Sequence, residues 1–303
     1  MDPIYGKIAS NKRRTFLFFL FYAFLFVAIG YLLGIAFVGL PEVGVIIAII
    51  AYIVIVLVTY YKGQNVIASM AGAKEVSKQQ EPFLHNTVEA LSIAAGKPVP
   101  KIYIIETDVP NAFAAGRNPD NASITVTRGL MNRLNRQELE GVIAHEMAHI
   151  SNYDVLLATV AVVLAGTIVY LGIIARRAVF YGGLGRSRSR DSGKGQLVIL
   201  LIMLVVGILA PLFAQLLRFA ISRQREFLAD ATAADFTGYP EALASALEKI
   251  TDMQTGDPRL ENKALDGLYI INPMLGARST GRMQTLFSTH PPTEQRIKRL
   301  RDM

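Results

Sequence analysis

The chain alternates between long apolar runs and segments of mixed polarity. Four runs carry no charged residue and are long enough to cross a bilayer, which takes about 20 apolar residues in a helix. These runs are residues 15–40, 43–61, 155–175 and 196–217. Only Pro41 and Glu42 separate the first two, which predicts a helical hairpin. The first run follows a basic triplet as a signal peptide would, but it is too long for a cleaved signal, so we interpret it as a retained anchor.

The segments of mixed polarity predict a small domain of helices and strands. Helices are expected at residues 81–95, 137–152, 223–236, 240–253 and 293–302, and short strands at 101–106, 111–116 and 123–127. The helix at 137–152 runs almost directly into the third apolar run. Residues 258–282 are rich in turn formers, and residues 182–195 form a loop of Gly, Ser and Arg. The predicted fold class is a mainly α integral membrane protein with four hydrophobic helices and a small β-sheet.

Composition and charge agree with a membrane protein. Hydrophobic residues make up 52% of the chain, and the formal net charge is +7. The positive charges cluster beside the apolar runs, where they hold helix ends at the lipid headgroups. No motif for RNA or DNA binding is visible, so we expect no nucleic-acid partner. The chain has no cysteine, which excludes disulfides and leaves histidines and carboxylates as the metal ligands.

His145, Glu146 and His149 form the motif H-E-x-x-H inside the helix expected at 137–152. Two histidines four positions apart lie on one face of a helix, so both imidazoles can reach one zinc ion. Glu146 then lies beside the metal as a general base. The chain contains only four histidines, so this spacing is hard to explain by chance. We therefore predict one catalytic zinc ion per chain rather than an ordinary helix with two histidines.

A catalytic zinc ion usually has three protein ligands and one open position, so a third ligand must come from elsewhere. Glu226 and His290 are the two main candidates. Asp230 lies one turn after Glu226, which suits a ligand with a second carboxylate behind it; alternatively, the pair belongs to a solvated helix face. Asn152 and Val155 occupy the Gly and third His positions of the metzincin motif. This excludes that motif and favours a glutamate as third ligand.

In this order, the motifs resemble the HtpX family of membrane zinc peptidases, heat-shock proteases related to the CAAX prenyl endopeptidases. The resemblance covers essentially the whole length. It includes N-A-F-A-x-G at residues 111–116, H-E-x-x-H, E-x-x-x-D from Glu226 to Asp230, and T-H-P-P-x-x-x-R from Thr289 to Arg296, together with the two pairs of apolar runs.

The resemblance implies a gluzincin-like catalytic domain. Its zinc ligands would be His145, His149 and Glu226, with Glu146 as the base that takes a proton from the attacking water. Asp230 would stand behind the ligands. By their positions in the family pattern, His290 and Arg296 are candidates to stabilise the oxyanion or to hold the fold of the site.

Two further segments are candidates for the site. The strand containing Asn111, Ala112, Phe113 and Ala114 would pair through its free edge with an extended substrate, although an ordinary hairpin strand is the alternative. Asp154 follows His149 at the start of the third apolar run. It either contacts the ligand shell or caps that helix, and we favour the cap.

The expected topology follows from the need to bring two distant segments to one metal. Four full spans place the N-terminus and residues 62–154 and 218–303 on one face, and the basic residues before the first run place that face in the cytoplasm. The loop at 176–195 is also basic, yet four spans put it outside. Either the pair 155–217 does not fully cross, or the first hairpin dominates the orientation, or these helices cross obliquely against the catalytic domain.

The predicted function is a zinc endopeptidase of the cell membrane that cleaves membrane or misfolded proteins in quality control. The expected parts are a transmembrane hairpin (1–61), a first catalytic segment (62–154), a second hydrophobic pair (155–217) and a second catalytic segment (218–303). One alternative is a CAAX-type prenyl-protein peptidase, for which four runs are too few. The other is a membrane scaffold with a structural zinc, which would not need Glu146.

Overall fold

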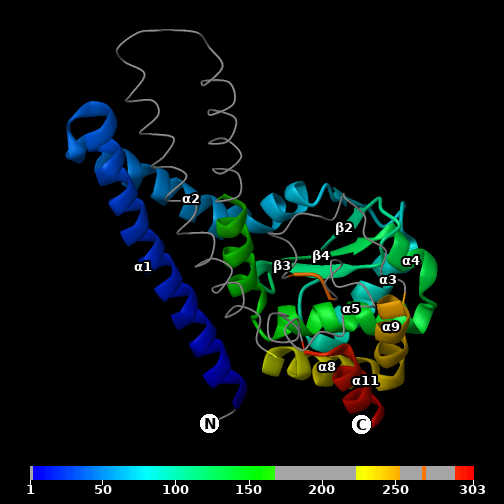
Figure 1. Ribbon diagram of the computed structural model, residues 1–303. Helices are drawn as coiled ribbons and strands as arrows, with labels where there is room; N and C mark the ends of the chain where they lie inside the picture. Colours follow the sequence, from blue (N-terminus) through cyan, green and yellow to red (C-terminus); the bar gives the residue numbers. More distant parts are fainter. Residues whose placement is uncertain (1–2, 168–222, 253–267, 271–290) are drawn as a thin grey trace.

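The computed structural model describes residues 3–167, 223–252, 268–270 and 291–303. Figure 1 shows a long helical hairpin attached to a small domain built from a sheet and several helices. The labelled helices are α1 (Pro3–Val38), α2 (Pro41–Met70), α3 (Pro82–Ala95), α4 (Arg128–Arg133), α5 (Arg136–Ser151), α8 (Arg223–Thr237), α9 (Pro240–Asp252) and α11 (Thr293–Arg301). A further helix, without a label, covers Val155–Thr167. The strands are β1 (Lys74–Glu75), β2 (Lys101–Ile105), β3 (Ala112–Asn118) and β4 (Asn121–Thr127).

The predicted helices and strands of the small domain that lie in the described segments are present, with boundaries that differ by one or two residues. The two helices of the hairpin extend beyond the predicted apolar runs, since α1 begins at Pro3 and α2 ends at Met70. Two elements were not predicted. Strand β1 has two residues and forms only by pairing with β2, so no hydrophobic pattern marks it. Helix α4 has six residues and begins where the Thr127 side chain accepts a hydrogen bond from the Leu130 amide, a local cap without an apolar period.

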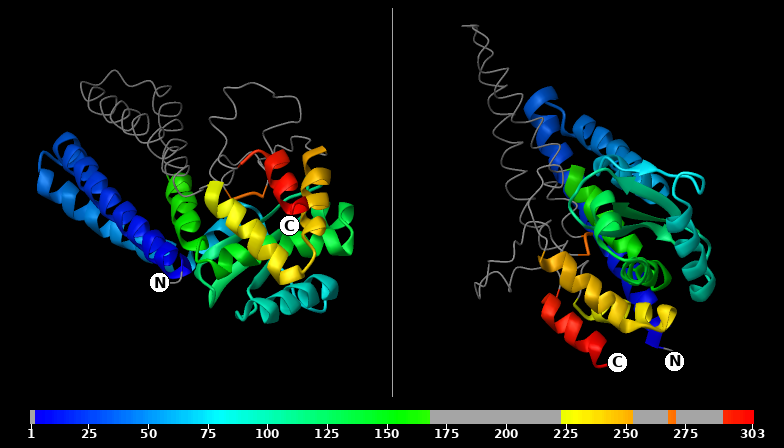
Figure 2. Two further views of the ribbon diagram at one scale, coloured as in Figure 1. Left: turned by 90° about the horizontal axis from the view of Figure 1, so that it is seen from below. Right: turned by 90° about the vertical axis from the view of Figure 1, so that its right-hand side faces the viewer.

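Helices α1 and α2 are long and apolar enough to cross a membrane. The candidate spans are Thr15–Ile35 and Pro41–Met70, and only 12% and 11% of their most apolar windows are buried within the protein. The two helices lie side by side in the left view of Figure 2, and the Tyr52 hydroxyl of α2 donates a hydrogen bond to the Phe19 carbonyl of α1 at 2.7 Å. Glycines allow this contact, since a Cβ atom at Gly44 would collide with Gly30 and Gly34. The predicted hairpin is therefore confirmed as a pair of closely packed, outwardly apolar helices.

Helix α5 is followed after a short break by a helix in the third apolar run, as the sequence predicts, but the two helices are not collinear. The chain breaks at Asn152, Tyr153 and Asp154, and the next helix, Val155–Thr167, leaves at an angle of 92° to α5. Tyr153 has a φ of 59°, the left-handed conformation that reverses a chain direction but is uncommon for a side chain of this size. Residues 168–175, the fourth run and the loop at 182–195 lie outside the described residues, as does nearly all of 258–282.

The sheet has the strand order β1-β2-β4-β3, so β3 lies at one edge. Strands β2 and β4 are parallel, whereas β3 and β4 form an antiparallel hairpin in which Ala112 pairs with Val126 and Ala114 with Ile124. The hairpin has an irregularity between Gly116 and Asn118. The edge position of β3 is what brings its backbone next to α5.

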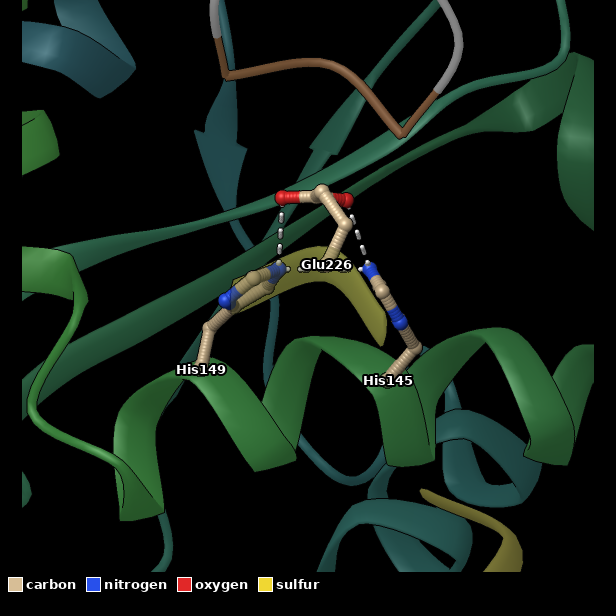
Figure 3. A group of neighbouring side chains, drawn as sticks. All are labelled: His145, His149 and Glu226. Carbon is tan, nitrogen blue, oxygen red and sulfur yellow. Dashed lines mark hydrogen bonds and ion pairs between the residues drawn. The ribbon is translucent and has the colours of Figure 1, made fainter. Parts of the chain in front are cut away.

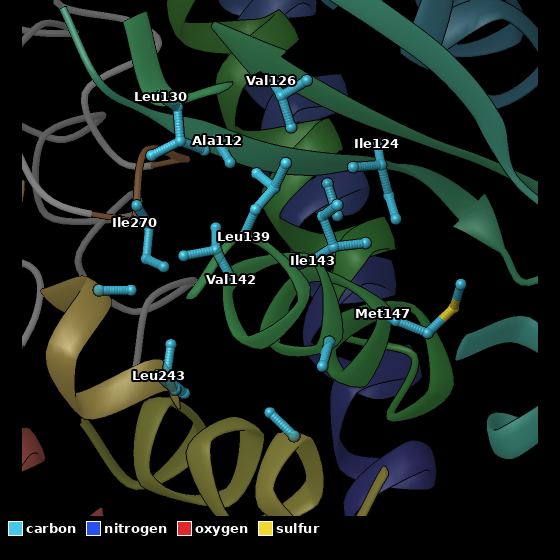
Figure 4. Close-up of a cluster of buried hydrophobic side chains, with 14 of the residues drawn as sticks. Ala112, Ile124, Val126, Leu130, Leu139, Val142, Ile143, Met147, Leu243 and Ile270 are labelled. Carbon is cyan, nitrogen blue, oxygen red and sulfur yellow. The ribbon is translucent and has the colours of Figure 1, made fainter. Parts of the chain in front are cut away.

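The sheet separates two hydrophobic cores because successive side chains of a strand point to opposite faces. Ala112 and Ala114 of β3 belong to the larger core, which α3, α5, α8 and α9 complete. Phe113 and Ala115 belong to the second core, together with residues of α1, α2 and the helix Val155–Thr167. Figure 4 shows the larger core, with α5 between the sheet and the helix that carries Leu243.

Helix α5 is buried on nearly all sides. Its N-terminus is closed by a capping box in which Asn135 and Glu138 exchange hydrogen bonds between side chain and backbone. Gly141 lies against the backbone of α9, where a Cβ atom would come within 2.8 Å of the Leu243 nitrogen. These contacts hold the H-E-x-x-H helix rigidly between the sheet and the two C-terminal helices α8 and α9.

Candidate metal centre

Three side chains from two helices meet at one point. His145 and His149 project from the same face of α5, and Glu226 reaches them from α8 (Figure 3). The two Nε2 atoms are 3.2 Å apart. The Glu226 carboxylate lies 3.6 Å from each of them, with Oε2 facing His145 and Oε1 facing His149. The sequence-predicted ligands are therefore neighbours in the fold.

This spacing fits a single tetrahedral metal ion. Two donors bound to one such ion at about 2.0–2.1 Å lie roughly 3.3 Å apart. The separations of 3.2 and 3.6 Å agree with that value. Two imidazoles and one carboxylate also leave a fourth position for water, which is the pattern of a catalytic rather than a structural ion.

A carboxylate on the far side of the ring holds His145. The Nδ1 atom of His145 lies 3.0 Å from Oδ1 of Asp230, so Nδ1–H donates to the carboxylate and Nε2 keeps its lone pair for a metal. Asp230 in turn accepts two hydrogen bonds from Arg296, at 2.9 Å from Nε and 2.7 Å from Nη2. Arg296 is only 1% exposed and also donates to the Ile270 carbonyl.

A second carboxylate stands behind His149. Oδ2 of Asp154 lies 3.4 Å from Nδ1 of His149, and Arg225 approaches the other Asp154 oxygen at 3.9 Å. Asp154 immediately precedes the helix Val155–Thr167. It therefore occupies the capping position of that helix and also contacts His149. Arg225 is one of the basic residues after the fourth apolar run that the sequence predicts to lie at the lipid headgroups. Instead, its side chain is only 11% exposed and faces Asp154.

The charges around the His145 ring favour positive charge at its nitrogens. Burial and Arg296 both lower the pKa of His145, but Asp230 and Glu226 outweigh them and bring it to about 9. Burial raises the pKa of Asp230, but the opposing effect of Arg296 and His145 is larger and lowers this pKa to about 2. The same carboxylates that stabilise a protonated imidazole would stabilise a metal cation in its place.

Glu146 lies beside the three ligands and is 2% exposed. Burial is the main influence on this carboxyl group and raises its pKa above the ordinary value. The Ala114 amide of β3 donates a hydrogen bond to it, which opposes that rise. A buried carboxylate with a raised pKa is suited to accept a proton and to return it near neutral pH.

The outer edge of β3 is partly occupied, which differs from the expectation of a free edge. The Ala112 carbonyl accepts a hydrogen bond from the Ile270 amide at 3.1 Å. The Gly116 amide donates to the Thr159 hydroxyl at 2.8 Å, and the Ala114 amide donates to Glu146. Sequence reasoning did not identify Ile270 or Thr159, because neither lies in a motif.

Of the remaining predicted site residues, some lie beside the metal ligands and others do not. Asn111 is buried just before β3, where its backbone N–H donates a hydrogen bond to the Thr127 hydroxyl. Phe113 points away from the metal ligands into the second core, against Tyr269. Arg296 lies beside the site, whereas His290 falls outside the described residues.

Comparison with known proteins gives a consistent picture. Residues 78–303 match the model of peptidase family M48. The chain is 47% identical to a protease HtpX homolog of Dictyoglomus turgidum, over 99% of this chain and 94% of the relative. It is 41% identical to a protease HtpX homolog of Streptococcus gordonii, over 99% of this chain and 100% of the relative.

The similarity to a solved structure is weaker than these sequence matches. The crystal structure of S. mikatae Ste24p matches with a TM-score of 0.48 and 18% identity, over 83% of this chain and 57% of that one. The full-length sequence matches are decisive by themselves. This chain belongs to peptidase family M48 and, within it, to the HtpX-type membrane-associated metalloproteases.

Proposed function

We propose that this protease uses one zinc ion held by His145, His149 and Glu226 to hydrolyse peptide bonds of membrane or misfolded proteins. The observation that carries the proposal is the convergence of three donor atoms at separations of 3.2–3.6 Å beside a buried glutamate. Zinc accepts this mixture of imidazole and carboxylate ligands readily. A bound zinc ion would polarise the scissile carbonyl and acidify the attacking water.

Glu146 is the proposed general base. Its carboxylate takes a proton from the attacking water and then delivers it to the leaving amine nitrogen. The raised pKa of Glu146 supports the first step, because a stronger base accepts the proton more readily. The Ala114 amide orients the carboxylate by donating to it.

Two aspartates are proposed to orient the ligands. Asp230, anchored by Arg296, holds the ring of His145, while Asp154 holds the ring of His149. Hydrogen-bond partners of this kind usually change metal affinity 10- to 100-fold, roughly, when they are removed. His290, from its place in the family pattern, is proposed to stabilise the oxyanion.

Residues 111–114 are proposed to align the substrate along the outer edge of β3. The small side chains of Ala112 and Ala114 allow close approach of an extended chain. A substrate strand that pairs with the Ala112 carbonyl has to replace its hydrogen bond from Ile270. Substrate binding and release of the segment around Ile270 are therefore linked.

The proposed location is the cell membrane, with several spans and the active site on the cytoplasmic side. Residues 62–154 and 218–303 would form one catalytic domain that the hydrophobic pair 155–217 interrupts. The larger core supports this division, since it contains residues of α5 and of α9. Membrane proteins and their cytosolic segments are the substrates that this placement favours, in protein quality control.

Cleavage of casein by detergent-purified protein tests the proposal. Wild type is compared with Glu146→Gln and with Glu140→Gln, a control on the same helix, each with added zinc and after chelation. We expect wild type and the control to cleave, to stop after chelation and to recover with zinc, whereas Glu146→Gln stays inactive with zinc bound. Cleavage by Glu146→Gln at the wild-type rate would overturn the proposal.

A further inference from the structure

Helix α2 changes its surroundings near Tyr60 and Tyr61. Up to this point its surface is apolar and outward-facing, whereas Ile67 and Ala68, further along, are buried against the domain. Tyr60 and Tyr61 themselves are 41% and 60% exposed, and Lys62 follows them. Tyrosines at the end of a span mark the level of the lipid headgroups. Residues 60–62 therefore lie where α2 leaves the bilayer.

An open hollow lies at this level, between α2 and the β3–β4 hairpin. Its lining consists of Thr59, Tyr60, Tyr61, Gly63, Gln64, Gly116, Arg117 and Asn121. None of these residues is acidic. The hollow therefore offers a positive charge, hydroxyl groups and amides, which is a chemistry suited to an anion rather than to a cation.

Arg117 is the charged group of this hollow. Its guanidinium lies 5.0 Å from the ring centre of Tyr60 and 4.9 Å from that of Tyr61. The two rings are nearly perpendicular, at 85° to each other, so the guanidinium lies against two aromatic walls. Cation–π contacts do not use the N–H groups as hydrogen-bond donors to an acceptor, and these groups remain for a carboxylate or phosphate. Within the described residues, Arg117 has these ring contacts but no carboxylate or hydrogen-bond acceptor.

Other polar atoms of the hollow are also unsatisfied in the described part of the chain. The Thr59 hydroxyl, the Gln64 carbonyl oxygen and the Arg117 Nε are buried without a hydrogen-bond partner there. Buried polar groups are nearly always paired with protein, water or ligand. Of these groups, the Thr59 hydroxyl and the Arg117 guanidinium can donate to an anion, whereas the Gln64 oxygen can only accept. An arginine between two aromatic rings, beside a free hydroxyl donor and with no acid in the lining, is an arrangement that suits an anionic group.

We propose that this hollow binds the phosphate group of an anionic phospholipid, with Arg117 as its charge partner and Tyr60 and Tyr61 as its walls. A phosphate accepts two hydrogen bonds from an arginine side chain. A lipid is favoured over a soluble phosphate because both tyrosines are exposed at the end of a lipid-facing helix. Arg117 belongs to β3, three residues after Ala114, so the lipid would tie the membrane surface to the strand that contacts Glu146.

Native mass spectrometry of detergent-purified protein tests this proposal without relying on peptidase activity. Wild type, Arg117→Gln and Arg133→Gln are each titrated with phosphatidylglycerol and with phosphatidylcholine, in the presence and absence of excess inorganic phosphate. Arg133 is an exposed arginine on α4, so its replacement removes the same charge away from α2. Thermal unfolding of each variant shows that it remains folded.

The wild type and Arg133→Gln should each retain one more bound lipid molecule per chain when titrated with phosphatidylglycerol than when titrated with phosphatidylcholine. Arg117→Gln should bind that lipid about tenfold more weakly or worse, since a charge-assisted pair is lost. Arg117→Lys, which keeps the charge without the planar fork, should fall between them and serves if Arg117→Gln unfolds. Equal retention of both lipids by the wild type, or an unchanged affinity in the Arg117 variants, would overturn the proposal. Displacement of the lipid by inorganic phosphate would assign the site to a soluble anion instead.

Discussion

Arg296 and Asp230 are 66 positions apart and form a two-point ion pair, with Nε 2.9 Å from Oδ2 and Nη2 2.7 Å from Oδ1. Both side chains are almost completely buried. Because Asp230 also contacts Nδ1 of His145, this pair connects the C-terminal helix α11 to the metal centre. The integrity of the site should therefore depend on a helix that supplies none of the metal ligands.

Replacing Arg296 by methionine should destabilise the protein strongly. The change breaks the buried ion pair and leaves Asp230 with His145 as its remaining neighbour, and breaking a buried pair typically costs about 3–5 kcal/mol. We expect a lower free energy of unfolding and weaker metal binding in the same variant. Lys298→Gln, an exposed change on the same helix, is the control for chemical unfolding in detergent. If both variants unfolded at the same denaturant concentration, the structural role of Arg296 would be wrong.

Replacing Asp154 by asparagine should weaken metal binding while the fold remains. The change removes the negative charge that faces Nδ1 of His149, and losses of about 10- to 100-fold in metal affinity are usual for such partners. Competition with a chromogenic chelator measures this affinity directly. The exposed Asp120→Asn serves as the control. An unchanged metal affinity in Asp154→Asn would contradict this role and leave Asp154 only the role of a helix cap.

The acid stability of the metal-free protein should depend on Asp230. Its pKa is about 2 in the folded protein, below the ordinary aspartate value of 3.8 that applies to the unfolded chain. The ionised group therefore stabilises the fold fully above about pH 4, and this contribution is lost as the pH falls toward 2. The size expected from the shift is about 2 kcal/mol. The difference in unfolding free energy between wild type and Asp230→Asn should narrow over that range, and a constant difference would contradict the assignment.

Replacing Gly141 by alanine should destabilise the catalytic domain. The new Cβ atom would lie 2.8 Å from the Leu243 nitrogen and 3.1 Å from the Ala242 carbonyl carbon. Both are backbone atoms of α9 that cannot turn aside, and overpacking of this kind typically costs about 1–3 kcal/mol. Thermal unfolding beside Glu140→Ala on the same helix measures the effect. A gain in stability from the better helix former would show that α5 and α9 pack less closely than described.

Local patterns account for the parts of this protein that were predictable. The spacing of His145 and His149 and the long apolar runs are continuous patterns in the sequence, so these two histidines and most elements could be predicted from it. The residues alone left Glu226 and His290 as alternative third ligands. The 92° bend after α5 could not, because it depends on the left-handed conformation of Tyr153. The contacts of Arg225 with Asp154 and of Ile270 with Ala112 join distant segments and leave no periodic signal.

The most direct test of the central claim is an anomalous difference map at the zinc absorption edge, from crystals of the purified protein. The account predicts one peak per chain, bounded by Nε2 of His145, Nε2 of His149 and the carboxylate of Glu226, at about 2.0–2.2 Å from each donor. It also predicts that a crystal of Glu226→Ala shows a much weaker peak there. A zinc peak elsewhere in the chain, with this cluster empty, would contradict the account.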